Sequence, residues 1–296
     1  MNFNVEVKDL FLSYKEFAAL KYISFRLEDK KIYGLIGRNG AGKTSLLSLL
    51  ASLREPTKGS ITIAGVPPME NPEIMQNVAF IHQSDYRDET STVKGMLELV
   101  SRYRPHYDAE YARYLVQRFQ LPTDKAINKL SQGMQSVLDV IIGLAGRASI
   151  TIFDEAYLGM DAPTRMIFYQ EILDDQAKFP RMFIISTHLV SEMDYLFDEV
   201  LILHQGRLVL KEEYEALLSR GLTITGSAAE VEEFVQDMHV IGEQQLGKTK
   251  AVMVFADNNA ENNEEPKKKA QMSGFEVSQI SLQDLFIHLT DEREEN

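Results

Sequence analysis

The feature that most constrains the fold is a glycine-punctuated turn, GRNGAGKT, at residues 37–44. It fits the pattern G-x-x-x-x-G-K-[ST], whose fixed positions are here Gly37, Gly42, Lys43 and Thr44. The pattern is informative only between a strand and a helix. An apolar segment at 32–36 precedes the turn, and leucines follow it at helical spacing. This context predicts a phosphate-binding loop. The plain alternative is a tight strand-to-helix turn with an exposed lysine.

The residue types in this turn suit a polyphosphate ligand. Gly37, Gly40 and Gly42 allow backbone conformations that other residues avoid, so that several N–H groups converge at a helix N-terminus. Lys43 supplies a positive charge for the outer phosphates, and the Thr44 hydroxyl is a ligand suited to Mg²⁺. We therefore expect the chain to bind a nucleoside triphosphate.

Composition places the chain among globular proteins and restricts its partners. Its 296 residues, 44% of them apolar, suffice for one large α/β domain and a smaller unit. The absence of cysteine excludes disulfides and thiolate metal sites and fits a reducing compartment. The net charge of −13 argues against nucleic acid as the main partner. We expect no signal peptide and no membrane span, because neither pattern occurs in the sequence.

Two acids follow the apolar segment at 149–153. Charged groups at the end of a buried strand are unfavourable unless a cation meets them. In a second phosphate-binding element, Asp154 would hold Mg²⁺ and Glu155 would polarise the attacking water. The alternative is a pair of acids that begins a surface loop. His188 follows another apolar segment, at 182–186. If the segments 149–153 and 182–186 form neighbouring parallel strands, His188 lies at the edge of the sheet where ligands bind. The alternative is a structural role, which is more usual for a single histidine.

Tyr14 lies between two segments of alternating polarity, 3–11 and 23–27, which we expect to form antiparallel strands. An exposed aromatic upstream of a phosphate loop is suited to stacking on adenine. Taken alone, such a tyrosine is more often part of an ordinary core.

Over residues 1–215 the order of motifs resembles the ATP-binding subunit of an ABC transporter. The matching elements are the phosphate loop, Gln83, LSQGM at 130–134, SITIFDE at 149–155, Asp161 and His188. Their correct order is more specific than any one of them. The resemblance is to bacterial subunits of the exporter type.

The resemblance implies a role for each matching residue. The nucleotide is cradled by Gly37, Arg38, Asn39, Gly40, Ala41, Gly42, Lys43, Thr44 and Ser45. Tyr14 stacks on adenine, while Ser131 and Gly133 close over the γ-phosphate held by the opposite subunit. Glu155 is the catalytic base, His188 senses the γ-phosphate and Gln83 contacts the attacking water. The expected Mg²⁺ ligands are Thr44, Gln83 and Asp154, and Asp161 contacts the other subunit.

Four residues depart from the family pattern. Gln132 stands where glycine is commoner and Met134 where glutamine is commoner. Ala156 and Tyr157 stand where proline and a hydroxyl residue are usual. These differences bear on closure of the site or on the rate of hydrolysis.

The expected fold class is α/β, a P-loop NTPase core with a mixed sheet flanked by helices and an antiparallel β subdomain. An α-helical subdomain is inserted at about 84–146. We expect an ATPase domain at 1–220 and a small C-terminal α+β domain at 221–296. Within the latter, the polar and proline-bearing segment 257–271 is predicted to be a flexible loop.

The resulting hypothesis is an ATPase that uses ATP and Mg²⁺ to power a membrane exporter of drugs, peptides or lipid-like molecules. One chain holds one phosphate loop and one signature, so the site needs a second copy or a paralogous ATPase subunit. The motion would drive an integral membrane permease from the cytoplasmic face. The segment 84–107 is the expected docking surface, although a solvated charged face explains its residues about as well.

Two other hypotheses remain. One is a soluble ABC-type ATPase that acts on ribosomes, DNA or Fe–S assembly. The acidic balance, the single cassette and the absence of cysteine argue against it. The other is an inactive regulatory subunit, which the presence of Lys43, Asp154, Glu155 and His188 disfavours.

Overall fold

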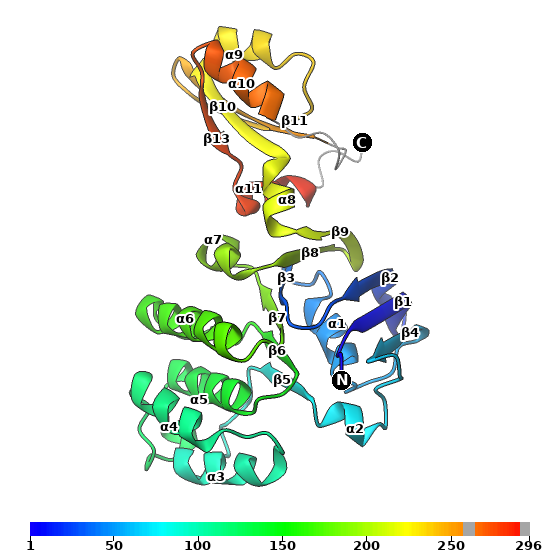
Figure 1. Ribbon diagram of the computed structural model, residues 1–296, viewed down its shortest axis with the longest axis vertical. Coiled ribbons are helices and arrows are strands. Elements are labelled where there is room, and N and C mark those ends of the chain that lie inside the picture. Colours follow the sequence, from blue (N-terminus) through cyan, green and yellow to red (C-terminus); the bar gives the residue numbers. More distant parts are fainter. Residues whose placement is uncertain (257–263, 291–296) are drawn as a thin grey trace.

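A computed structural model describes residues 1–256 and 264–290, which form three β-sheets with helices packed against them (Figure 1). The largest sheet has six strands in the order β5-β6-β7-β3-β8-β9. In that order they are Val78–His82, Ile150–Asp154, Met182–Thr187, Ile32–Gly37, Glu199–His204 and Arg207–Glu213. The pairs from β5 to β8 are parallel, and β9 is antiparallel to β8. The predicted mixed sheet is confirmed.

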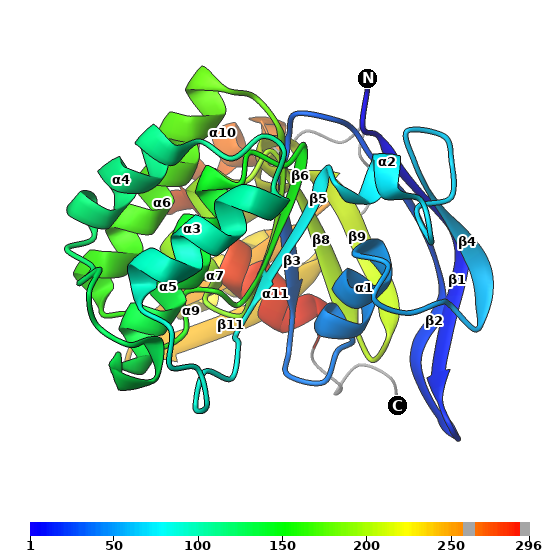
Figure 2. The ribbon, with the colours of Figure 1, turned by 90° about the horizontal axis from the view of Figure 1, so that it is seen from below.

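The central strands are apolar on both faces because each face is covered. Along β7, Phe183 and Ile185 belong to one core, whereas Met182 and Ile184 belong to the other. The first core is covered by helices, namely α3 (Val93–Tyr103), α4 (Ala109–Arg118), α5 (Gln132–Ala145), α6 (Ala162–Lys178) and α7 (Val190–Met193) (Figure 2). Continuous apolar strands are the expected result of burial on both sides.

An antiparallel sheet and mainly one helix cover the second core. The sheet has the order β2-β1-β4, and its strands are Phe17–Leu27, Val5–Tyr14 and Lys58–Ile63. The helix is α1 (Lys43–Leu50), which follows the glycine-rich turn directly. A short helix, α2 (Pro72–Met75), connects this side to β5. The expected antiparallel β subdomain is therefore present.

Three helices occupy the connection between β5 and β6, where a helical insertion was predicted. Each begins after a residue that caps its first turn, as helix starts generally do. Thr92 accepts a hydrogen bond from Gly95 N, and Asp108 accepts one from Tyr111 N. Ser131 caps α5 in the same way, with Met134 N 3.3 Å from its Oγ. A 3₁₀ turn, Ile127–Lys129, precedes α5.

The C-terminal part is built on a four-stranded antiparallel sheet in the order β11-β12-β10-β13. These strands are Val240–Leu246, Thr249–Phe255, Gly221–Ser227 and Glu276–Gln279. Its helices are α8 (Tyr214–Ser219), α9 (Ala228–Phe234), α10 (Glu264–Met272) and α11 (Leu282–Leu289). One face has its own small core, while Met253 and Phe255 join α11 in the larger core shared with the six-stranded sheet. Figure 1 shows this sheet at the opposite end of the molecule from α3.

The prediction of a flexible loop at 257–271 is wrong over its second half, where α10 forms. Residues 257–263 lie outside the described residues. Pro266 lies in the first turn of α10, where backbone N–H groups have no intrahelical partner anyway. Ala270 is fully buried, and Lys269 pairs with Glu265 at 2.8 Å. One small apolar residue, Ala270, anchors this mostly polar helix. A single alanine is too weak a signal for composition to predict a helix here.

None of the described helices combines the length and the apolar character that crossing a membrane requires.

A buried ion-pair network joins α4, α5, α6 and β7 at the amino ends of the strands. Asp175, whose side chain is 1% exposed, pairs with Arg147 and with Arg181 Nη2 at 2.8 Å. Arg147 also contacts Asp108 at 3.0 Å. One carboxylate therefore serves two largely buried guanidinium groups.

Replacing that carboxylate should destabilise the fold. Asp175→Asn leaves Arg181 buried without a counter-ion, and we expect a loss of about 3–5 kcal/mol in the free energy of unfolding. Asp174→Asn is the matched control, because among the described residues the Asp174 side chain is hydrogen-bonded to the exposed Gln170 amide on the same helix and forms no ion pair. Urea unfolding followed by circular dichroism measures both, and equal midpoints for the two variants would contradict the role of Asp175.

A second buried carboxylate ties the helical insertion to the segment after β5. Tyr86 donates a hydrogen bond from its hydroxyl to Asp139 Oδ1 at 2.5 Å. Burial in α5 raises the pKa of Asp139 to about 6, although Tyr86 and His82 oppose the shift. The ionised form is therefore disfavoured in the folded chain relative to the unfolded one.

This pKa gives stability a defined pH dependence. The pKa of Asp139 in the folded chain lies above the ordinary value of 3.8. Its contribution to the free energy of unfolding is therefore largest below pH 4 and is lost as pH rises through about 6. Between pH 4 and pH 7 the free energy of unfolding of the parent should fall by on the order of 2–3 kcal/mol relative to that of Asp139→Asn, whose side chain cannot ionise. Urea midpoints at several pH values measure this difference. Parallel pH profiles for parent and variant would refute it.

Candidate functional site

The glycine-rich turn joins the end of β3 to α1 and has the geometry its sequence predicts. Gly40 and Gly42 have φ angles of +82° and +105°, in the region that favours glycine. A Cβ on Gly42 would lie 2.8 Å from the Ala19 carbonyl oxygen, and one on Gly37 would lie 2.8 Å from that of Leu203. Side chains at these two positions would displace the neighbouring backbone, so the turn depends on glycine.

Lys43 is held inside this turn. Its side chain is only 7% exposed, and Nζ donates a hydrogen bond to the Gly37 carbonyl at 2.8 Å. Nζ also lies 3.2 Å from Glu155 Oε1, which comes from the end of β6. The lysine is therefore already fixed at the centre of the loop, with a carboxylate as its counter-ion.

The acids that follow β6 are positioned by the neighbouring strand β7. Ser186 donates a hydrogen bond from its hydroxyl to Asp154 Oδ1 at 2.5 Å and accepts one from Glu155 N at 3.0 Å. Glu155 has a φ of +48°, an unusual value for a residue other than glycine. Sequence reasoning missed Ser186, and the available signal was a hydroxyl residue at the end of an apolar strand.

His188 completes the cluster from the end of β7. Its Nδ1 lies 3.2 Å from Glu155 Oε1, the same oxygen that contacts Lys43. Because β6, β7 and β3 are adjacent and parallel, their carboxyl ends place all three side chains at one edge of the sheet. The structure therefore brings together three of the residues selected from the sequence.

A cavity of about 310 Å³ lies over Lys43 and Glu155 of this cluster. It is lined by Tyr14, Phe17, Ala19, Asn39, Gly40, Gly42, Lys43, Thr44, Ser45 and Glu155. Tyr14 ends β1, is 39% exposed, and its hydroxyl lies 3.3 Å from Ser45 Oγ. Its ring also faces the Arg54 guanidinium at 5.0 Å. An aromatic wall beside backbone N–H groups and a lysine suits a nucleotide base next to its phosphates.

Among the predicted residues that do not line that cavity are Gly37, Arg38, Ala41, Gln83, Ser131, Gly133, Asp154 and His188. Gln83 is exposed. It follows His82, which pairs in register with Asp154, so Gln83 lies at the same level along the strands as Glu155. Within the described ranges its side chain has no hydrogen-bond partner. Ser131 is exposed at the start of α5. A Cβ on Gly133 would lie 2.4 Å from the Gly159 carbonyl oxygen, so this turn packs tightly on the loop after Glu155.

The predicted Mg²⁺ ligands match the chemistry of that ion. Mg²⁺ is commonly held by one or two protein oxygens together with substrate phosphates and water, rather than by a protein cage. Thr44 and Asp154 offer a hydroxyl and a buried carboxylate beside the loop, and Gln83 offers an amide oxygen. In the described part of the chain, no group of three or more acidic or histidine side chains forms a metal site by itself.

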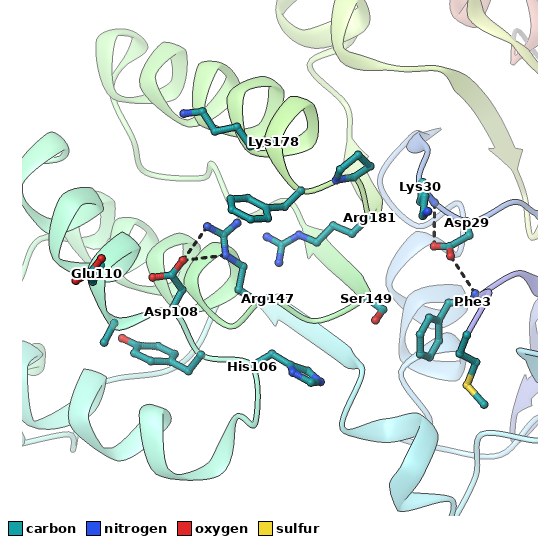
Figure 3. A pocket seen from close by; sticks show the side chains of 15 residues that line it. Phe3, Asp29, Lys30, His106, Asp108, Glu110, Arg147, Ser149, Lys178 and Arg181 are labelled. Atoms are coloured by element: carbon teal, nitrogen blue, oxygen red, sulfur yellow. Dashed lines mark hydrogen bonds and ion pairs between the residues drawn. The ribbon is translucent and has the colours of Figure 1, made fainter.

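A larger cavity, about 980 Å³, lies at the opposite, amino ends of the strands (Figure 3). Its lining includes Lys30, two residues before β3, and Ser149 and Arg181, which directly precede β6 and β7. Burial lowers the pKa of Arg181 to about 10. Its Nε and Nη1 atoms have no hydrogen-bond partner, but both are shielded from solvent. These two Arg181 atoms are therefore not accessible to a ligand in the cavity.

Comparison with known proteins agrees with this geometry. The ABC transporter family model matches residues 20–158. The ABC transporter ATP-binding protein YtrB of Bacillus subtilis is 28% identical over 217 residues, covering 71% of this chain and 74% of that protein. The Nod factor export ATP-binding protein I of Burkholderia orbicola is 30% identical over 203 residues, or 66% of each protein.

A solved structure shares the fold. It is a dimeric ATP-binding cassette in a post-hydrolysis state, bound to ADP and Pi. It superposes with a TM-score of 0.61 at 18% identity, covering 71% of this chain and 98% of that one. This likeness shows the fold alone, whereas the matches in sequence show the family. The chain belongs to the ABC transporter family as an ATP-binding protein, and it is an ATPase of that family.

Proposed function

We propose that this ATPase powers a membrane exporter by closing and opening a head-to-tail dimer around Mg²⁺ and ATP. The observation that carries the proposal is the convergence of Lys43, Glu155 and His188 on the loop that would hold the γ-phosphate. A positive charge, a base and a phosphate sensor at one point are the parts that phosphoryl transfer to water requires.

In this proposal the residues of the chain divide the chemistry among them. The backbone of residues 37–45 and Lys43 hold the triphosphate, and Tyr14 packs on the base. Bound Mg²⁺ would neutralise charge between the outer phosphates, with Thr44, Asp154 and Gln83 as its protein ligands. Glu155 takes the proton from the attacking water, and His188 donates a hydrogen bond to the γ-phosphate.

The placement of Ser131 and Gly133 supports a dimer. Neither residue lines the cavity over Lys43, so a single chain leaves that side of the nucleotide uncovered. Ser131 is exposed at the N-terminus of the 14-residue helix α5, where backbone N–H groups favour an anion. A second copy, or a paralogous ATPase subunit, would supply this helix start to the nucleotide. The solved cassette of the same fold is itself dimeric.

Export and a membrane partner are proposed from the relatives. The Nod factor export protein is an export ATP-binding protein by name, and YtrB is a transporter subunit. On this basis the chain would lie at the cytoplasmic face of the cell membrane and act on an integral permease. The segment 84–107 offers exposed side chains for docking, among them Leu99 and Tyr103, which are 47% and 78% exposed. We also propose residues 1–220 as the ATPase domain and 221–296 as an accessory domain.

Substituting the proposed base tests hydrolysis and dimerisation together. In Glu155→Gln the attacking water loses its base, and turnover should fall about 10²- to 10⁴-fold. Because ATP then persists, the dimer should become stable enough to elute as such in gel filtration with ATP. Lys43→Ala is the contrasting variant, since it should weaken ATP binding about tenfold or more and give no such dimer. Unchanged phosphate release in Glu155→Gln would remove Glu155 from its role.

The membrane partner is tested by purification from the native cell. Detergent-solubilised membranes should yield this chain together with an integral membrane protein, and Tyr103→Glu in the proposed docking segment should reduce that recovery. Recovery with ribosomes or nucleic acid in place of a membrane protein would support the soluble ATPase and refute the exporter.

A further inference from the structure

Tyr157 occupies one of the positions at which the chain departs from the family pattern. It is 1% exposed and sits two residues after Glu155, in the loop that leads to α6. The loop is fixed at both sides, because Leu158 N donates to the Glu155 carbonyl at 3.1 Å and Ser136 Oγ donates to the Leu158 carbonyl at 2.6 Å. The tyrosine ring is therefore held rigidly, and its hydroxyl reaches the end of β7.

Three polar atoms surround the Tyr157 hydroxyl. Thr187 Oγ1 lies at 3.1 Å, His188 Nδ1 at 3.3 Å and the His188 backbone N at 3.4 Å. Thr187 Oγ1 itself accepts from Leu189 N at 2.9 Å. The His188 N–H donates to the Tyr157 oxygen, and burial raises the pKa of Tyr157, so the hydroxyl keeps its proton. That proton has two possible acceptors, Thr187 Oγ1 and His188 Nδ1.

His188 Nδ1 also has two competing neighbours. Glu155 Oε1, at 3.2 Å, only accepts when ionised, so this contact requires a proton on Nδ1. Tyr157 is able to donate instead, which requires Nδ1 without a proton and places the proton on Nε2. Only the second arrangement of a neutral imidazole leaves an N–H on Nε2. That nitrogen has no hydrogen-bond partner among the residues that the structure describes.

Nucleotide binding would decide between the two arrangements. In this structure Glu155 Oε1 is shared by Lys43 Nζ and His188 Nδ1, both at 3.2 Å. A γ-phosphate would attract Lys43, and in the proposed mechanism the Glu155 carboxylate turns from Nδ1 to the attacking water. A replacement donor at Nδ1 is then required if the ring is to keep its orientation and present Nε2–H to the phosphate.

We propose that Tyr157 is this replacement donor, a positioning residue whose hydroxyl takes over His188 Nδ1 when Glu155 turns to the attacking water. The inference rests on the proposed hydrolytic roles of Glu155 and His188. It adds a residue that touches neither nucleotide nor water and acts only through the orientation and tautomer of the imidazole. Such control of a histidine by the partner of its other nitrogen is a general feature of these side chains.

Tyr157→Phe is the test, because it keeps the ring and removes only the hydroxyl. We expect kcat to fall about tenfold, the effect of one lost hydrogen bond, while KM for ATP stays within about twofold. Tyr169→Phe is the matched control. Tyr169 is also fully buried, but its hydroxyl has no hydrogen-bond partner among the described residues, so its removal should leave kcat unchanged. A kcat for Tyr157→Phe equal to that of the control would overturn the proposal.

A spectroscopic measurement separates this inference from the proposed function. The ¹⁵N shifts of the imidazole are recorded with a non-hydrolysable ATP analogue, and the His188 signals are assigned by their loss in His188→Gln. We expect Nε2 protonated and Nδ1 unprotonated in the parent, and a shift toward Nδ1–H or a mixture in Tyr157→Phe. A parent with Nδ1 protonated refutes the proposal even if the variant fails to fold. Failure of hydrolysis in the parent would instead refute the proposed function and leave this readout intact.

Discussion

The Glu155 carboxylate is the point on which the nucleotide site depends. One of its oxygens contacts a lysine from the loop after β3 and a histidine from the end of β7, each at 3.2 Å. Such convergence requires β6, β7 and β3 to be adjacent and parallel, so that their ends meet at one edge. It also requires Glu155 to adopt a φ of +48°, which Ser186 stabilises by accepting its backbone N–H. The six-stranded sheet and its two cores serve to fix this edge.

That arrangement has a consequence for the binding of ATP. Lys43 and Glu155 neutralise each other, which avoids leaving either charge unpaired in a partly buried site. In the proposed mechanism, a triphosphate would offer Lys43 a more negative partner, and its binding would separate the pair and free the carboxylate. Glu155, as the proposed base, would then become available to water in the step that delivers the phosphate.

The sequence predicted the parts of the fold that depend on local pattern. The turn at residues 37–44 and the helical insertion within residues 84–146 are where periodicity and motif spacing placed them. It did not predict contacts that depend on strand register, such as Ser186 with Asp154, because residues 32 apart carry no pattern that joins them. The pair Tyr86 and Asp139 was missed for the same reason. Helix α10 was missed because its composition is polar and one buried alanine anchors it.

The departure at Tyr157 illustrates how a substitution is accommodated by geometry. A short hydroxyl side chain at this position could not span the distance that a buried tyrosine spans from its own backbone to the end of β7. Two residues further on, the loop turns through Gly159, at a φ of +82°, and packs on Gly133. The same loop that carries Tyr157 therefore touches the start of α5, where Ser131 would face a second subunit. A rearrangement at His188 and the closure of a dimer would share one short, rigid segment of chain, and this is the physical basis on which one could influence the other.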